Sequence, residues 1–322
     1  MGEKKREEIG LRIVYMGTPE FAVPSLYQLL MAGHDVCLVV TQPDRRRGRG
    51  HKMKPSPIKE VAEEFGIPVF QPARIKVPEA IDFICSQKPE LIVVVAYGQI
   101  LPSEILRCPE YGSINVHGSL LPAYRGPAPI QRAIMDGESV TGVTTMYMDE
   151  TMDTGDIILQ KQIEILPDTT CGELAQKLSE LGAELLLETV DQIQWGVAPR
   201  IPQNDELATY APFIKSEDEI IDWSRTAVQI HNQIRGLNPR PGAYTRVDDI
   251  KIKVFQSRII ENDVPGSIPG EVTEVNDEGF AVQTGQGTLL ALEVQRAGKK
   301  RMSTGQFLKG FDINPGLRLG NG

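Results

Sequence analysis

Two polar side chains near the middle of the chain have the types and the spacing for chemistry that develops an oxyanion. Asn115 and His117 lie two residues apart in 113–117, a predicted strand, so both side chains point to one face. A carboxamide can donate to an oxyanion, and an imidazole can hold or transfer a proton. The competing interpretation is a satisfied buried histidine beside a turn asparagine. Flanking glycines and prolines favour the close approach of a ligand, and therefore a site.

An acid for this pair is offered by the segment Met-Asp-Thr-Gly-Asp at 152–156, between predicted strands at 142–148 and 157–165. A carboxylate beside an imidazole stabilises its charged form and orients the ring. Asp153 and Asp156 both suit this role, and their order in the sequence does not choose between them. An Asx turn without chemistry is the alternative for either residue.

The elements that must position these side chains follow a strand–helix alternation. Apolar strands are predicted at 11–16, 36–41, 67–70 and 91–97, and helices at 20–32, 57–65 and 78–87. This order predicts an α/β fold with a Rossmann-like, doubly wound and mostly parallel sheet, in which ligands bind at the carboxyl ends of the strands. The first strand is not followed by G-x-G-x-x-G, which argues against a nicotinamide cofactor. A long helix is predicted at 170–195, with Thr170 and Glu173 as a capping box and leucines packed against the sheet.

The last third of the chain has a different pattern of predicted secondary structure. A polar segment at 196–212 is predicted to be a linker, and a short helix is expected near 225–235. Strand candidates at 244–247, 250–259, 270–275, 280–283 and 289–294 predict a small OB-like β-barrel. The domain prediction is therefore a disordered lead-in at 1–10, a catalytic domain at 11–195, the linker, and a β-barrel domain at 213–322.

Composition excludes several classes of protein. The 322 residues carry a formal net charge of −9, with 41% hydrophobic residues and no apolar run near the length of a membrane span. The first ten residues lack the apolar core of a signal peptide. The four cysteines are widely separated, which argues against a zinc site and for reduced thiols in a cytoplasmic protein. We expect no membrane association, no metal and a monomer.

Two basic clusters stand out in this acidic chain. The loop 42–55 and a second segment before the chain's end suggest a polyanion partner, because flexible glycines let basic side chains follow a phosphate backbone. The alternative interpretation of each cluster is a solvated loop that binds no partner. The candidate nucleic-acid contacts are Arg45, Arg46, Arg47, Arg49, Lys52 and Lys54 in the loop, with Lys299, Lys300 and Arg301 in the second cluster.

These motifs together resemble the methionyl-tRNA formyltransferases, a family of folate-dependent formyltransferases, from about residue 11 to about residue 310. The N-x-H…D pattern is shared by other folate-dependent formyltransferases, whereas the opening segment, the basic loop and the C-terminal segment point to the tRNA enzymes. The matching segments are Met16-Gly-Thr-Pro-Glu-Phe-Ala22, Thr41-Gln-Pro-Asp44, Val95-Ala-Tyr-Gly98, Asn115-Val-His-Gly-Ser-Leu-Leu-Pro122, Met152-Asp-Thr-Gly-Asp156, Ala208-Thr-Tyr-Ala211, Asp222-Trp-Ser224 and Ala297-Gly-Lys-Lys-Arg-Met302.

The resemblance implies transfer of a formyl group from 10-formyltetrahydrofolate to the α-amine of methionyl initiator tRNA. It implies that Asn115, His117 and Asp153 are catalytic, which selects Asp153 over Asp156, and that Phe21 lies near the methionyl side chain. The basic loop would enter near the acceptor end of the tRNA, and the barrel would bind tRNA. The implied folate-binding residues are Ser119, Leu120, Leu121 and Pro122.

Two other functions remain open from the residues. A different folate enzyme, such as a sugar-nucleotide or glycinamide-ribotide formyltransferase or a formyltetrahydrofolate hydrolase, would share the three polar residues but would not need the basic loop. A non-catalytic RNA-binding module would not need Asn115, His117 and Asp153 together.

Overall fold

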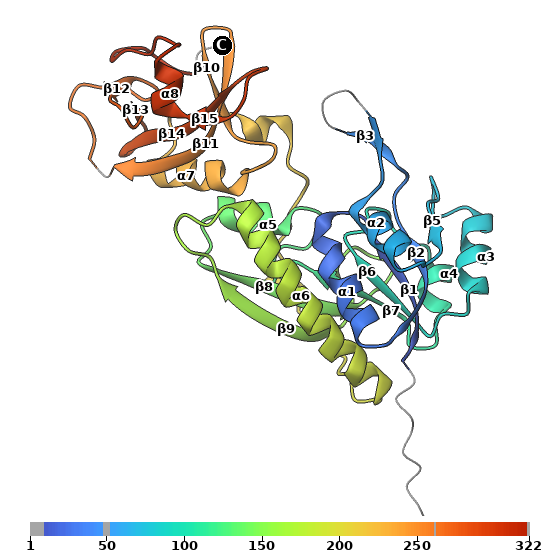
Figure 1. Cartoon of the computed structure of the whole chain (residues 1–322). Helices are drawn as coiled ribbons and strands as arrows, with labels where there is room; N and C mark the ends of the chain where they lie inside the picture. The colour runs from blue at the N-terminus through green and yellow to red at the C-terminus, as the bar shows by residue number, and fades with distance from the viewer. Residues whose placement is uncertain (1–9, 48–51, 261, 321–322) are drawn as a thin grey trace, which may run out of the picture. The chain divides into compact units, whose positions relative to one another are not determined.

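The computed structural model describes residues 10–47, 52–260 and 262–320 (Figure 1). Two compact units emerge from the packing of the chain. The first holds residues up to 126, 141–163 and 175–210, and the second holds 127–140, 164–174 and the residues from 211 onward. Residues 196–210 of the predicted linker therefore pack with the first unit, and two short segments from the predicted catalytic domain pack with the second. Arg49 and residues 1–9 of the predicted lead-in lie outside the described residues.

The first unit is built on a seven-stranded sheet with the order β5-β2-β1-β6-β7-β8-β9. Strand β1 pairs in parallel with β2 and β6, β6 with β7, and β2 with β5, while β7 and β8 are antiparallel. The predicted Rossmann-like, mostly parallel sheet is confirmed. The strands are β1 (Arg12–Gly17), β2 (Asp35–Val40), β5 (Val69–Phe70), β6 (Leu91–Val95), β7 (Ser113–His117), β8 (Val140–Tyr147) and β9 (Ile157–Glu164).

The helices lie where apolar spacing and caps place them. The helical elements before residue 196 are η1 (Glu20–Ala22), α1 (Val23–Met31), α2 (Pro57–Glu64), α3 (Pro78–Ser86), α4 (Ser103–Arg107), α5 (Pro129–Met135) and α6 (Cys171–Gln194). The predicted capping box starts α6, because Glu173 accepts from the Thr170 N–H at 2.8 Å and Thr170 accepts from the Glu173 N–H at 3.3 Å. Helix α6 meets the sheet closely at Gly182, where an added Cβ would lie 3.0 Å from Val116.

Strand β6 shows why the centre of this sheet is stable. Its five residues, Leu-Ile-Val-Val-Val, are all buried. β-Branched side chains pack well on a pleated sheet that is covered on both faces, as a central parallel strand requires. Burial of the strands leaves the loops at their carboxyl ends to carry polar side chains.

The second unit contains a six-stranded antiparallel sheet with the path β10-β11-β14-β13-β12, and β15 pairs with β14. The sheet is curled as a half-barrel, which confirms the predicted OB-like fold class. Its core includes Trp223, Phe280 and Val294, all at most 4% exposed. The elements are η3 (Ser216–Glu219), α7 (Ala227–Gly236), β10 (Tyr244–Val247), β11 (Ile250–Ile260), β12 (Val272–Val275), β13 (Phe280–Gln283), β14 (Thr288–Arg296), β15 (Met302–Ser303) and α8 (Thr304–Leu308).

The basic segment is more regular than the predicted flexible loop. Strands β3 (Arg45–Arg47) and β4 (Lys52–Lys54) form an antiparallel hairpin in which Arg45 faces Lys54. Its ends are held together, because the hydroxyls of Thr41 and Ser56 lie 2.8 Å apart. The expectation of an irregular loop is therefore wrong for these six residues, since the fixed ends bring the two arms within pairing distance.

Candidate active site

His117 ends strand β7 and is only 7% exposed at its side chain. Its Nδ1 lies 3.7 Å from Asp153 Oδ2, and Asp153 is 12% exposed. On the other side of the ring, Nε2 lies 3.0 Å from the carbonyl oxygen of Tyr124. A carbonyl oxygen can only accept, so Nε2 donates to Tyr124, and Nδ1 faces the Asp153 carboxylate. The structure thus brings together His117 and Asp153, which are distant in the sequence.

Asn115 lies on the same strand, two residues before His117, and is half-buried. Strand alternation puts both side chains on one face of the sheet. Within the part of the chain that the structure describes, the Asn115 carboxamide has no hydrogen-bond partner. An amide N–H that is held on a rigid strand and left without a protein acceptor is available to a ligand oxygen.

The loop that carries Asp153 has a constrained backbone. Asp153 has φ of +59°, the left-handed region that few residues other than glycine occupy. Two residues on, a Cβ at Gly155 would lie 1.8 Å from the carbonyl oxygen of Tyr147, so only glycine fits there. Asp153 Oδ2 also accepts from the Gly126 N–H at 2.8 Å. Asp156 instead lies 3.6 Å from Arg200, away from His117, so the structure places Asp153 beside the imidazole.

The segment 119–122 that follows β7 is fixed by Thr144 of β8. The Thr144 hydroxyl donates to the carbonyl of Ser119 at 2.7 Å and accepts from the Leu121 N–H at 3.1 Å. The Ser119 hydroxyl itself donates to the carbonyl of Ala123 at 2.6 Å. Leu120 and Pro122 are half-buried. These contacts make the predicted folate segment a rigid wall next to His117 in the chain.

Four features near His117 had no role assigned from the sequence: the Tyr124 carbonyl, the Gly126 N–H, Arg125 and Gln203. Arg125 is 3% exposed and its guanidinium donates to Gln203 Oε1 at 3.0 and 2.8 Å. Gln203 Nε2 donates to the carbonyls of Asp153 and Gly155. A buried arginine in the motif Ala-Tyr-Arg-Gly was a signal that sequence reasoning could have used, whereas Gln203 carries no such signal.

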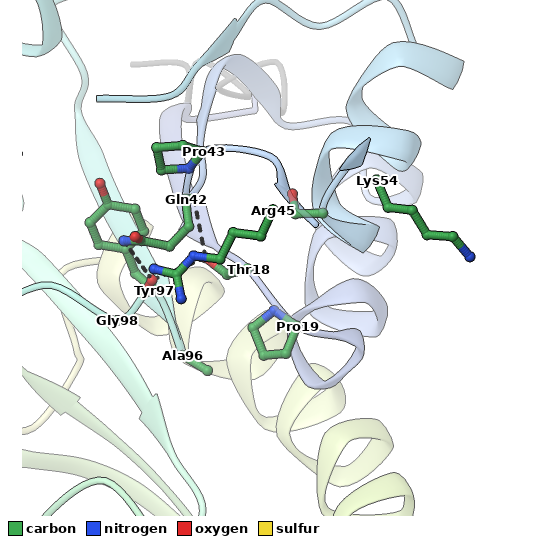
Figure 2. A pocket seen from close by; sticks show the side chains of 10 residues that line it. Thr18, Pro19, Gln42, Pro43, Arg45, Lys54, Ala96, Tyr97 and Gly98 are labelled. Atoms are coloured by element: carbon green, nitrogen blue, oxygen red, sulfur yellow. Dashed lines mark hydrogen bonds between the residues drawn. The ribbon is translucent and has the colours of Figure 1, made fainter. Parts of the chain in front are cut away.

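A cavity of about 220 Å³ opens at the carboxyl ends of β1, β2 and β6 (Figure 2). Thr18, Gln42 and Tyr97 form its polar wall: the Thr18 hydroxyl donates to the Tyr97 carbonyl at 3.0 Å, and Gln42 Nε2 donates to the same oxygen at 3.3 Å. Strand order reverses between β1 and β6, and open α/β sheets bind ligands at such a point. The Arg45 and Lys54 side chains complete the lining from the basic hairpin.

The other predicted residues are placed as follows. Phe21 is half-buried in η1, and its carbonyl accepts from the Ser179 hydroxyl of α6 at 2.8 Å. Backbone pairing sets Arg46 and Arg47 on β3 and Lys52 on β4. The hairpin base is anchored by Asp44, which accepts from Gln71 and Lys59, and these contacts lower the pKa of that carboxyl.

The second basic cluster divides in the second unit. Lys299 and Lys300 are exposed. Arg301 pairs with Glu293, donates to Asn238 at 3.2 Å and stacks over the ring of Phe255 at 4.3 Å. Its guanidinium therefore serves packing within the barrel as well as facing solvent.

The described residues form neither a metal-binding cluster nor a membrane-spanning helix. Within residues 10–47, 52–260 and 262–320, no group of three or more potential metal-ligating side chains comes together. In the same ranges, none of the helices has the length and apolar character needed to cross a membrane.

Comparisons with known proteins identify the family of the chain. Residues 11–190 match the formyl transferase family model, and 213–312 match that of the formyl transferase C-terminal domain. The methionyl-tRNA formyltransferase of Syntrophomonas wolfei is 51% identical over 97% of this chain and 99% of its own length. That of Symbiobacterium thermophilum is 53% identical over 96% of this chain and 95% of its own.

Solved structures share the fold at lower identity. An N-formyltransferase from Helicobacter canadensis, in complex with folinic acid and dTDP-3-aminofucose, superimposes with a TM-score of 0.68 at 21% identity, over 87% of this chain and 98% of its own. HypX from Aquifex aeolicus, in complex with tetrahydrofolic acid, gives 0.65 at 20% identity over 95% of this chain and 49% of its own. High identity over nearly the full length and a match to both family models establish that the chain belongs to the methionyl-tRNA formyltransferase family.

Proposed function

We propose that the chain transfers the formyl group of 10-formyltetrahydrofolate to the α-amine of methionine on initiator tRNA. The observation that carries this proposal is the constellation at the end of β7, where a carboxamide without a partner among the described residues shares a strand face with a histidine whose Nδ1 faces Asp153 at 3.7 Å. Identity of about half over nearly the whole chain supports the same substrate.

The reaction needs an oxyanion site and a route for one proton. The neutral amine attacks the formyl carbon and forms a C–N bond, which gives a tetrahedral intermediate with a negative oxygen. Asn115 and a proton on His117 Nδ1 donate to that oxygen, and removing one such donor costs roughly 100- to 1,000-fold in rate. The bond from carbon to the folate nitrogen then breaks, and the proton lost by the amine is taken up by the departing tetrahydrofolate.

The Tyr124 carbonyl and the Asp153 carboxylate support these roles of the two His117 ring nitrogens. The Tyr124 carbonyl accepts from Nε2 and so fixes a proton there, which leaves Nδ1 as the nitrogen that faces the reaction. Asp153 lies too far from Nδ1 for a direct hydrogen bond but close enough to stabilise its charge. The donated proton can therefore point to the substrate without losing the support of the carboxylate.

The two substrates would approach the sheet edge from neighbouring loops. For the folate we propose Ser119, Leu120, Leu121 and Pro122, because Thr144 holds this segment rigid directly after His117. For the methionyl end of the tRNA we propose the cavity of Figure 2, since Phe21 lies two residues after its lining residue Pro19 and would offer an apolar contact beside it. The hairpin cations, Arg45 and Lys54 among them, would meet acceptor-end phosphates.

The proposed domain roles follow from the sequence and the exposed cations. Residues 11–195 would carry the chemistry together with 196–210, which pack with the same unit. Residues 213–322 would bind tRNA through Lys299 and Lys300, with Arg301 contributing from its packed position. We further propose a monomer that acts in the cytoplasm.

A formylation assay tests the proposal. Purified protein, 10-formyltetrahydrofolate and methionyl initiator tRNA should give formyl-methionine on the tRNA, with elongator methionyl-tRNA as the matched comparison. Product with a sugar nucleotide but none with methionyl-tRNA would overturn the assignment. An equal rate with both tRNAs would remove the initiator restriction.

A further inference from the structure

We propose that Gln203 is a positioning residue, which sets the relative placement of Asp153 and His117 from outside the catalytic motif. The inference rests on the proposed function, because it names a residue that serves the same reaction. Gln203 lies in the segment 196–212 that the sequence predicted to be a linker, and it is half-buried. Its side chain joins two loops that contact His117 from opposite sides.

Every hydrogen-bonding position of the Gln203 carboxamide is used. Oε1 accepts from Nε and from one terminal nitrogen of Arg125, at 3.0 and 2.8 Å. Nε2 donates to the carbonyls of Asp153 and Gly155, at 2.9 and 2.8 Å. A guanidinium only donates and a carbonyl only accepts, so these partners permit a single orientation of the amide. The contact is therefore specific for glutamine.

Arg125 makes the connection rigid. Its guanidinium is 3% exposed, and a buried cation needs acceptors to offset its lost hydration. Gln203 supplies one acceptor and Asp205 supplies another at 2.8 Å. The backbone N–H of Arg125 also donates to the carbonyl of Thr209 at 2.9 Å. Gln203, Asp205 and Thr209 thus hold the loop that presents the Tyr124 carbonyl to His117 Nε2.

The second loop is the one that needs support. Asp153 has a left-handed φ of +59°, and such a conformation persists only when its surroundings hold it. Gln203 Nε2 donates a hydrogen bond to the carbonyl of Asp153 in this turn and another to the carbonyl of Gly155, two residues later. Without these donors the turn can relax and move the Asp153 carboxylate. Misplacement of a catalytic group by about 1 Å can cost on the order of 100-fold in rate.

Two variants and one control test this role. In Gln203→Met, a side chain of similar length keeps no hydrogen bond. In Gln203→Glu, the carboxylate still accepts from Arg125 but cannot donate to the two carbonyls, so the buried guanidinium stays satisfied. The control is Asn204→Ala, because Asn204 is exposed in the same segment, and among the described residues its side chain accepts only from the N–H of Glu206.

We expect kcat for formylation to fall about 10- to 100-fold in both Gln203 variants, with KM for each substrate within about threefold of the parent. A second measurement does not depend on formylation. The chain has four histidines, so histidine-labelled protein gives a simple NMR spectrum, and a His117→Gln sample assigns the His117 signal. That signal should shift in both Gln203 variants, while the signals of His34 and His231 and the whole spectrum of Asn204→Ala stay in place.

Several outcomes would overturn the inference. An unchanged kcat, or an unmoved His117 signal, would show that Gln203 does not place the pair. A raised KM at constant kcat would make it a binding residue, and loss of folding in both variants would make it structural only. If the parent protein formylates no tRNA but the His117 signal still responds, the proposed function fails and the positioning role stands.

Discussion

Replacing Asp153 by asparagine tests the electrostatic core of the site. The substitution keeps the size of the side chain and an oxygen that can accept from the Gly126 N–H, so the loop can stay in place. It removes the negative charge that lies 3.7 Å from His117 Nδ1. The change therefore separates the charge of Asp153 from its role in the fold.

The expected loss follows from that distance. At an effective dielectric constant of about 20, opposite charges about 4 Å apart attract by about 4 kcal/mol. Both side chains are nearly buried, at 7% and 12% exposed, so solvent screens the pair little. Since about 1.4 kcal/mol corresponds to tenfold in rate, the upper limit is about 1,000-fold, and the dipole of asparagine recovers part of it. We expect kcat to fall about 100- to 1,000-fold.

The measurement is single-turnover formylation of methionyl-tRNA at saturating 10-formyltetrahydrofolate, with thermal unfolding as a check of the fold. The matched control is Asp156→Asn, because Asp156 lies three residues away and pairs loosely with Arg200. Its rate should stay within about threefold of the parent. A loss below about threefold in Asp153→Asn, or a larger loss in the control, would refute the assignment of the charge to Asp153.

Three further predictions follow. Arg45→Ala with Lys54→Ala should weaken tRNA use and lower the salt slope of log kcat/KM by about 1 to 2, as measured between 50 and 200 mM salt. Burial lowers the pKa of His231 below 6.5, so the folded protein binds that proton less tightly than the unfolded chain does. The free energy of unfolding in urea should therefore be highest above about pH 6.5 and should fall below it. His231→Gln should reduce this dependence of the unfolding free energy on pH. Phe280→Ala should remove about 3–5 kcal/mol from the unfolding free energy reported by the fluorescence of buried Trp223.

Much of the architecture was predictable because it depends on local patterns. Strands β7, β10 and β13 have the predicted bounds, and the capping box at Thr170 starts α6 one residue later. Hydrophobic periodicity and caps act within a few residues, so they can be read without knowing the fold. The hairpin β3–β4 was missed because its ends are joined by Thr41 after β2 and Ser56 before α2, and the packing of these two elements brings the two hydroxyls together.

The candidate site also has features that depend on local sequence and features that depend on the tertiary structure. The sequence by itself determined that Asn115 and His117 share a face, since strand geometry fixes the direction of residues i and i+2. It also determined which segments carry charge and which carry apolar strands. Which acid reaches the imidazole was physically open until the loop of 152–156 was placed in space.

Only the tertiary structure decided that Asp153 and the Tyr124 carbonyl hold the two ring nitrogens of His117, and that Gln203 joins their loops. Of these contacts, the one from Gln203 to Asp153 links residues 50 positions apart across loops with no periodic pattern. Their geometry depends on the relative placement of whole elements, which arises when the sheet and α6 pack together. Local sequence preferences act over a few residues and do not encode such distances.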